Sequence, residues 1–236
     1  MRVNDELVSF VGKAPKKPLA LLKAIICLGG QDVKDYQLVD ALWPDDEGDS
    51  ARDAFRVALH RLRKILGDTE AILVEDGRVS LNRHLCWVDA LVFDELTNSA
   101  RGSAELDPSQ QRALALYRGA LLPADRDESW SMAMRERLRS KFMHHFGRLG
   151  SQLESQQAWN EALDLYLRGL DADNLTESFY QGLMRCHAAL GRHADALGAY
   201  RQLREMLAAT LGTGPSPATE TLYRSLKRAQ SGSEHR

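Results

Sequence analysis

Long hydrophobic runs are missing from this sequence, and cysteine is scarce. No apolar run approaches the ~20 residues that span a bilayer, and the first residues lack the basic start and apolar stretch of a secretory signal. The three cysteines, Cys27, Cys86 and Cys186, are scattered without a CxxC spacing, which disfavours a disulfide framework and a zinc site. We therefore expect a cytoplasmic protein without membrane contacts, whose cysteines are reduced and mostly buried small hydrophobes.

Signatures of catalysis and cofactor binding are missing too. The sequence has no Gly-rich phosphate loop, no HExxH motif, and no Ser or Cys in a nucleophile motif. His144 and His145 are adjacent, so they point to different sides of a helix and cannot chelate a metal as an i, i+4 pair does. We expect no enzyme activity, no cofactor and no bound metal.

What is present is the composition of an ordinary globular protein. The 236 residues are 44% hydrophobic and 27% charged, enough for one large or two ordinary domains. The formal net charge of −2 is weak for a nucleic-acid binder. The local distribution of charge therefore decides whether such a function fits.

The most distinctive charge pattern lies between Ser50 and Leu66, which reads as one amphipathic helix. Its apolar side consists of Phe55, Leu59, Leu62 and Leu66, flanked by Ala58 and Ile65. Between Arg52 and Lys64 there are four Arg and one Lys against one Asp, a balance of +4. Such a face suits a polyanion, although a merely solvated surface is the alternative for any charged helix face.

The segments around this helix follow the order of a winged helix-turn-helix. Residues 35–43 predict a short helix, which Pro44 closes. Downstream, two alternating runs at 71–74 and 78–81 flank an Asp-Gly pair, which predicts a β-hairpin. In a winged helix-turn-helix the second helix enters the DNA major groove, and the hairpin contacts the flanking backbone.

Upstream of these elements, the sequence predicts two short strands and a buried helix. Asn4-Asp5 suits a turn between strands within residues 2–12, and residues 19–28 form a very apolar helix that Gly29-Gly30 ends. Asp35 and Ser50 are the candidate N-caps of the two helices that follow.

The second half of the chain predicts helices joined by short breaks. They are expected at about 107–121, 130–155, 160–166, 176–190, 194–200 and 218–229, with a frayed end from Ser231. Ala162 and Tyr166 recur as Ala196 and Tyr200, an offset of 34 residues. This is the period of the tetratricopeptide repeat, whose helix pairs must stack to bury their apolar faces. A generic helical bundle is the alternative.

Together these segments resemble the antibiotic-regulatory-protein type of bacterial transcriptional activator. The resemblance is carried by QLVDALWPDD, AFRVALHRLRKILG, the Asp-Gly hairpin, WVDALVFDEL, and the C-terminal ADALGAYRQLREMLAATLGTGPSPATETL. It implies an OmpR-type winged helix followed by a bacterial transcriptional activator domain of tetratricopeptide-like helices. The expected fold is thus mainly α with a small β part: a DNA-binding domain at 1–98 and an all-α domain at 99–236.

The resemblance also places individual segments. The family's recognition helix corresponds to 51–66, with its hydrophobic-Arg pattern at Leu62-Arg63, and its wing corresponds to 72–81. Its C-terminal Leu-Gly-x-x-Pro run matches Leu211, Gly212 and Pro215. Family members usually begin with a fuller N-terminal sheet, so the chain is either a natural short form or a fragment of a longer regulator.

Nine residues are candidates for DNA contacts. The base-reading candidates on the outward face are Asp53, Arg56, Val57 and His60. The phosphate-contact candidates are Arg52, Arg61, Arg63, Lys64 and Arg78. A bidentate contact of Arg56 with guanine is worth roughly 1–3 kcal/mol of discrimination. A solvated residue or a phosphate contact is the alternative for each base reader, and an ion pair with an acid of the same domain is an alternative for Arg63.

The hypothesis is therefore a DNA-binding transcriptional activator. Its expected partners are double-stranded DNA with a direct-repeat operator, RNA polymerase, and neighbouring copies in a homodimer or a cooperative assembly on DNA. The competing hypothesis is a tetratricopeptide-type interaction or signalling scaffold that does not read DNA itself. A pure scaffold has no evident need for a +4 helix beside a hairpin.

Overall fold

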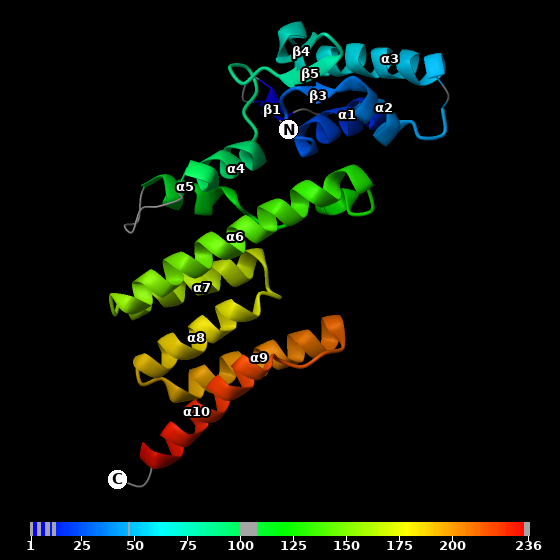
Figure 1. The fold of residues 1–236 in the computed structure, drawn as a ribbon. Coiled ribbons are helices and arrows are strands. Elements are labelled where there is room, and N and C mark those ends of the chain that lie inside the picture. Colours follow the sequence, from blue (N-terminus) through cyan, green and yellow to red (C-terminus); the bar gives the residue numbers. More distant parts are fainter. Residues whose placement is uncertain are drawn as a thin grey trace. The chain divides into compact units, whose positions relative to one another are not determined.

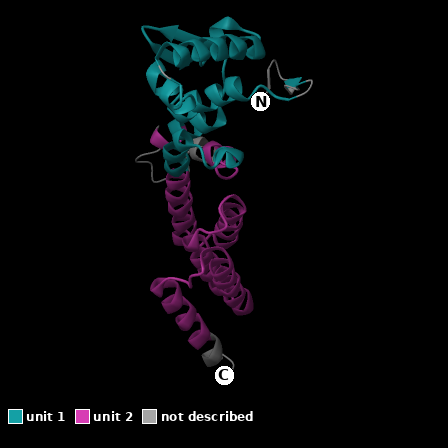
Figure 2. Cartoon of the chain, turned by 90° about the vertical axis from the view of Figure 1, so that its right-hand side faces the viewer, with its two compact units in different colours: residues 1–95, 121–138 teal, residues 96–120, 139–236 magenta. Residues whose placement is uncertain are grey.

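A computed structural model describes residues 2–3, 6–7, 10, 13–46, 48–99 and 108–233. The described chain is mainly helical, with a small β part near its N-terminus (Figure 1). It forms two compact units (Figure 2). The first comprises residues 1–95 and 121–138, and the second comprises 96–120 and 139–236. The predicted division at residue 98 stays a prediction.

The first unit has the order of elements that the sequence predicts for a winged helix-turn-helix. Its elements up to the hairpin are β1 (Arg2–Val3), β2 (Glu6–Leu7), α1 (Lys16–Cys27), β3 (Val33–Lys34), α2 (Asp35–Leu42), α3 (Gly48–Leu66), the 3-10 helix η1 (Thr69–Ala71), β4 (Ile72–Glu75) and β5 (Arg78–Leu81). β1 and β2 pair antiparallel, which confirms the two strands; the turn predicted at Asn4-Asp5 lies outside the described residues.

A three-stranded antiparallel sheet covers one side of the three helices. Its order is β3-β5-β4, so the second strand of the hairpin is central and Lys34 and Arg78 are direct neighbours across strands. Alternation puts Ile72, Val79 and Leu81 on the buried face of the sheet. The three helices bury apolar side chains in the same unit, among them Leu21, Ile25, Leu38, Phe55 and Leu62. This core fixes α3 by its apolar side.

Residues 121–138 complete the first unit from far along the sequence. They contain the 3-10 helix η2 (Pro123–Asp125) and the start of α6 (Ser129–Ser155). Asp125 forms an ion pair with Lys23 of α1, with 2.7 Å between Oδ2 and Nζ. Arg135 of α6 donates to the main-chain oxygens of Leu121, Leu122 and Asp125, and so holds the loop that carries this aspartate.

The remaining elements are helices. They are α4 (Asp89–Ser99), α5 (Pro108–Leu116), α7 (Trp159–Ala172), α8 (Glu177–Ala189), α9 (His193–Leu211) and α10 (Pro217–Ser233). In the second unit, α8 packs against α7 and α9, while α10 packs against α9 and α8. The stacking of successive antiparallel helices agrees with the predicted tetratricopeptide-like array.

The repeated tyrosine explains the stacking. Tyr166 of α7 is 2% exposed, and its ring lies against two glycines, Gly150 of α6 and Gly182 of α8. A Cβ at either glycine would lie 2.3 Å from a ring atom of Tyr166, so only glycine leaves room for the ring. The hydroxyl of Tyr166 donates to Glu154 at 2.6 Å, and Arg185 of α8 donates two hydrogen bonds to the same carboxylate.

Several predicted helix boundaries are wrong in detail. α3 begins at Gly48 and α2 at Asp35 itself, so neither Ser50 nor Asp35 occupies the N-cap position. α5 ends at Leu116 instead of continuing to about residue 121, and Gly119 within the predicted range has a φ of +130° that a helix cannot hold. α10 continues to Ser233, through the start of the predicted frayed end.

Candidate nucleic-acid interface

The recognition-helix candidate, α3, is held by its apolar side. Ala51, Phe55, Ala58, Leu59 and Leu62 are buried. The ring of Phe55 meets Trp43, the residue that follows α2, edge to face at 6.4 Å between ring centres. Because the apolar stripe is anchored in this way, the opposite side of α3 must face solvent.

That opposite side carries most of the predicted DNA contacts. On α3, the exposed candidates are Arg52, Asp53, Arg56, Val57, His60, Arg61 and Lys64. Val57 is 50% exposed and adds an apolar side chain to this otherwise polar surface. The structure thus brings seven of the nine candidates to one solvent-facing surface, which we call the α3 outer face.

Two of the arginines on the α3 outer face have acidic neighbours. Arg56 donates to Asp53 one turn earlier, with 3.1 Å between Nη1 and Oδ1, and both side chains are more than two-thirds exposed. Arg52 lies 4.0 Å from Asp49. Exposed pairs of this kind are weak because water screens them. They orient the guanidinium groups without preventing a phosphate or a base from replacing the carboxylate.

Arg63 differs from the other candidates because it is half-buried. Its Nε and Nη2 donate to the main-chain oxygen of Ile72 at 3.2 and 2.7 Å. The contact joins the C-terminal part of α3 to the first strand of the hairpin. The predicted alternative of an ion pair with an acid is not found in the described part of the chain, and a main-chain carbonyl takes its place.

The hairpin next to α3 has the geometry that its Asp-Gly turn predicts (Figure 1). Asp76 and Gly77 both have positive φ, 48° and 70°, as a two-residue type I′ turn requires. Glu75 and Arg78 are the residues paired next to the turn. The main-chain N–H of Asp35 donates to the carbonyl of Gly77 at 2.9 Å, which ties the turn to the start of α2. Arg78 is exposed at this end of the hairpin.

Sequence reasoning missed two exposed residues beside Arg78. Lys34 pairs with Arg78 across β3 and β5, and its ammonium lies 5.5 Å from the ring centre of Tyr36. Tyr36 is 53% exposed. Lys34 is therefore a second cation next to Arg78, and the exposed ring of Tyr36 lies against Lys34. In the sequence, Lys34 and Tyr36 lie at the junction of the short segment 31–34 with the helix predicted at 35–43, and nothing in that segment reveals which strand it pairs with.

Other chemistry is sparse in the described residues. No group of three His, Cys, Asp or Glu side chains in these ranges is arranged to hold a metal, and none of their helices is long and apolar enough to cross a membrane. Burial raises the pKa of the Cys27 and Cys186 thiols to about 11, so both remain protonated and unreactive at neutral pH. This confirms the expectation of buried cysteines for these two, while Cys86 is only half-buried.

A winged helix-turn-helix unit joined to a tetratricopeptide-like helical unit is the architecture of a bacterial transcriptional regulator. The model of the bacterial transcriptional activator domain matches residues 88–227, and the chain belongs to this family. The match confirms the resemblance that the sequence motifs suggest.

Relatives extend the likeness over most of the chain. Regulatory protein AfsR of Streptomyces griseus is 28% identical over 226 residues, covering 89% of this chain and 22% of that protein. Transcriptional regulatory protein EmbR of Mycobacterium tuberculosis is 25% identical over 230 residues, covering 91% of this chain and 58% of that protein. The chain thus spans about a fifth of AfsR and somewhat more than half of EmbR. These relatives are regulatory proteins.

The fold likeness includes the first unit. A solved structure of Mycobacterium tuberculosis EmbR in complex with a low affinity phosphopeptide matches with a TM-score of 0.65 at 21% identity. The match covers 93% of this chain and 61% of that chain. It shows a shared fold that runs through both the winged helix and the helical repeats.

Proposed function

We propose that this chain is a sequence-specific DNA-binding transcriptional activator whose first unit reads duplex DNA. The observation that carries the proposal is the α3 outer face: four cations, Arg52, Arg56, Arg61 and Lys64, against the single carboxylate of Asp53, on a helix whose other side is buried in the core. A recognition helix needs this combination, because the core fixes its orientation while the exposed side meets the major groove.

Contacts with bases are assigned to the middle of the α3 outer face. Arg56 suits a bidentate contact with guanine, and Asp53 beside it suits the amino group of cytosine. Val57 suits the methyl group of thymine, and His60 lies one turn beyond Arg56 on the same face. Each good bidentate pair contributes roughly 1–3 kcal/mol of discrimination against the wrong base.

Contacts with phosphates are assigned to the remaining candidates, Arg52, Arg61, Arg63, Lys64 and Arg78. Arg63 has a double role in this proposal, because its bonds to the hairpin use Nε and Nη2 and leave Nη1 for a phosphate. Lys34 adds a cation next to Arg78 at the hairpin. Such contacts set the position of the protein on the duplex and carry no sequence information.

The helical unit has the supporting role in this proposal. It would hold neighbouring copies together on a direct-repeat operator, as a homodimer or a cooperative assembly, and would contact RNA polymerase. We assign it no catalytic role, in line with its regulatory relatives. The division into a reader at 1–98 and an activator domain at 99–236 belongs to the same proposal. Since residues 121–138 pack in the first unit, DNA binding has to be tested on the full chain.

A protein-interaction scaffold without DNA reading is the second candidate. The stacked 34-residue repeat favours it, because such arrays bind partners along their surfaces. The two candidates differ in what the α3 outer face does. A scaffold retains its partners when arginines of this face are removed, whereas a DNA reader loses its operator.

The test is selection of duplexes from a random-sequence pool, followed by affinity measurements over a series of salt concentrations. The wild type is compared with Arg56→Ala/Arg61→Ala, and Arg201→Ala/Arg224→Ala in the helical unit serves as a charge-matched control. We expect the wild type and the control to enrich one repeated motif. Five phosphate contacts correspond to a slope of about −4.5 in log affinity against log salt. The Arg56/Arg61 variant should enrich no motif.

Two results would contradict the proposal. Absence of duplex binding at moderate salt by a folded wild type would leave the scaffold as the better candidate. Equal loss of binding in the control variant would show that net charge, and not the α3 outer face, governs binding.

A further inference from the structure

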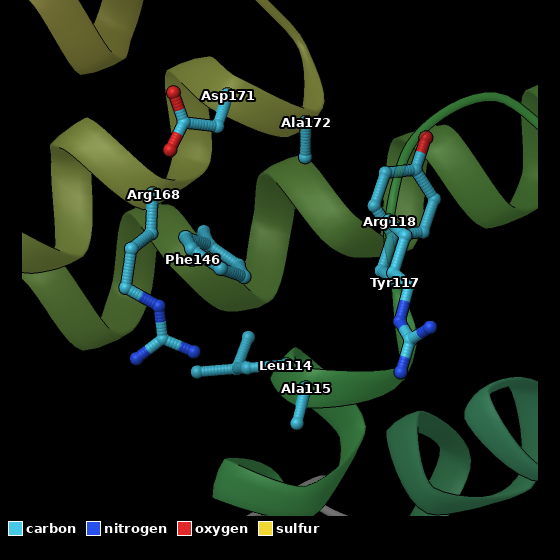
Figure 3. A pocket seen from close by; sticks show the side chains of 8 residues that line it. All are labelled: Leu114, Ala115, Tyr117, Arg118, Phe146, Arg168, Asp171 and Ala172. Atoms are coloured by element: carbon cyan, nitrogen blue, oxygen red, sulfur yellow. The ribbon is translucent and has the colours of Figure 1, made fainter.

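The second unit contains a pocket that DNA reading does not use. It has a volume of about 310 Å³ and lies where the end of α5 and the loop after it meet α6 and α7 (Figure 3). Residues that matter for its chemistry are Leu114, Tyr117, Arg118, Phe146, Arg168 and Asp171. The volume is at the lower end of small-molecule sites, which suits a small ring or a short alkyl chain and excludes a whole nucleotide or a folded partner.

The floor of this pocket is apolar and rigid. Phe146 is 2% exposed and Leu114 is 8% exposed, so both present only a small part of their surface to the pocket. Phe146 packs against Phe142 at 4.2 Å between ring centres, and Tyr117 stacks on Phe142 at 4.1 Å. Packed aromatic rings hold their positions when a ligand enters, so the floor is preformed.

The rim carries two arginines from different elements. Arg118 follows α5 and Arg168 lies on α7; both are exposed, and the described residues offer neither of them a hydrogen bond or an ion pair. Figure 3 shows the two guanidinium groups approaching from opposite sides of Leu114. Gly119 has a φ of +130°, which lets the chain turn directly after Arg118 and run close to Ala172 at the end of α7.

Asp171 sets the net charge of the rim. It lies three positions after Arg168 on α7, a spacing that favours ion pairs, yet the two side chains are not paired. Figure 3 shows the Asp171 carboxylate directed away from the Arg168 guanidinium. Two cations and one carboxylate leave the rim with one net positive charge, which matches a monoanion better than a phosphate dianion.

From this arrangement we propose that the pocket binds a small organic carboxylate with an apolar body. The carboxylate lies between Arg118 and Arg168, whose planar guanidinium groups match it in shape and charge. The apolar part lies on Phe146 and Leu114, where it displaces water from an apolar floor. This inference goes beyond the proposed reading of DNA and does not depend on it.

The test is a titration of the isotope-labelled full chain with phenylacetate and with hexanoate, followed by NMR chemical shifts. Phenylacetamide reports on the apolar body without the charge, and inorganic phosphate reports on the charge without the apolar body. We expect saturable shifts with at least one carboxylate, at a dissociation constant on the order of 1 mM. Shifts should centre on the loop after α5 and on α7, and both control compounds should bind at least tenfold more weakly.

Variants locate the site. Arg118→Ala/Arg168→Ala should weaken carboxylate binding at least tenfold, while Arg224→Ala, an exposed arginine on α10, should leave it unchanged. Both arginines are exposed, so their removal should leave the fold intact, which the unperturbed part of the spectrum checks. Three results overturn the proposal: no saturable shift with either carboxylate, equal binding of phenylacetamide or phosphate, or equal binding by the double variant.

Discussion

The clearest structural prediction concerns the ring of Tyr166 and the substitution Gly182→Ala. Tyr166 is 2% exposed and lies between Gly150 of α6 and Gly182 of α8. A Cβ at Gly182 would lie 2.3 Å from a ring atom, far inside van der Waals contact. The ring cannot move away, because a shift toward α6 meets the backbone at Gly150, and its hydroxyl is bound to Glu154.

Two opposing effects set the magnitude. Replacing a helical glycine by alanine stabilises a helix by about 1 kcal/mol. Forcing a methyl group into a packed core destabilises by about 1–3 kcal/mol, and the upper part of this range applies here because the ring is confined on both sides. We therefore expect Gly182→Ala to lower the free energy of unfolding by about 1–2 kcal/mol. The matched control is Gly198→Ala on α9, where a Cβ meets nothing within 4 Å. It should raise the same free energy by about 0.5–1 kcal/mol.

The assay is urea unfolding of the full chain, followed by far-UV circular dichroism. The double variant Gly182→Ala/Tyr166→Leu supplies a further check, because removing the ring hydroxyl and edge relieves the clash and makes the two effects non-additive. If Gly182→Ala proved as stable as Gly198→Ala, the ring would not be confined as the structure describes. Strict additivity in the double variant would contradict the argument equally.

Two further predictions concern single contacts. Arg63→Ala should lower the free energy of unfolding by about 1–2 kcal/mol, because the Ile72 carbonyl of the hairpin loses its charged donor. Arg61 is exposed, so Arg61→Ala should change the free energy of unfolding by no more than about 0.5 kcal/mol. Arg61→Ala should also reduce the slope of log affinity for DNA against log salt by about 0.9. Urea unfolding and salt titration check the two variants. A stable Arg63→Ala together with a destabilised Arg61→Ala would refute the structural role of Arg63. The pKa of Glu154 lies below its ordinary value: burial acts to raise it, but hydrogen bonds, foremost from Arg185, outweigh burial. The ionised Glu154 carboxylate therefore stabilises the folded chain fully above about pH 4.5, and this stabilisation is lost as the pH falls through the lowered pKa of Glu154. Glu154→Gln should be less stable at pH 7 and show a smaller further loss below pH 4.5 in acid unfolding, whereas the exposed Glu161→Gln should follow the wild type.

Local patterns in the sequence were sufficient to predict the recognition-helix candidate α3 and the hairpin of the first unit. The apolar spacing of Phe55, Leu59 and Leu62 predicts the amphipathic helix, because helical periodicity depends on neighbours within two turns. The Asp-Gly pair predicts the hairpin, because positive φ at both turn positions is a local requirement that Asp76 and Gly77 meet. Exposure of the α3 outer face follows from the same periodicity, and the structure bears it out for seven helix residues.

Helix ends were less predictable than helices. Ser50 and Asp35 have the side chains of N-caps, yet both lie within the helices that they were expected to precede. Capping preferences are worth only about 1 kcal/mol, so tertiary contacts shift a boundary by one or two residues. The strand β3 before α2 illustrates this, because its pairing with β5 sets where α2 begins.

The sequence by itself determined the class of fold, the cationic helix and the 34-residue repeat, since each is written in spacings along the chain. Only the tertiary structure showed that Arg63 holds the hairpin, that Gly150 and Gly182 make room for Tyr166, and that residues 121–138 return to the first unit. The Lys23–Asp125 ion pair joins positions 102 residues apart. No periodicity encodes such a contact, because it depends on how packed elements meet in space.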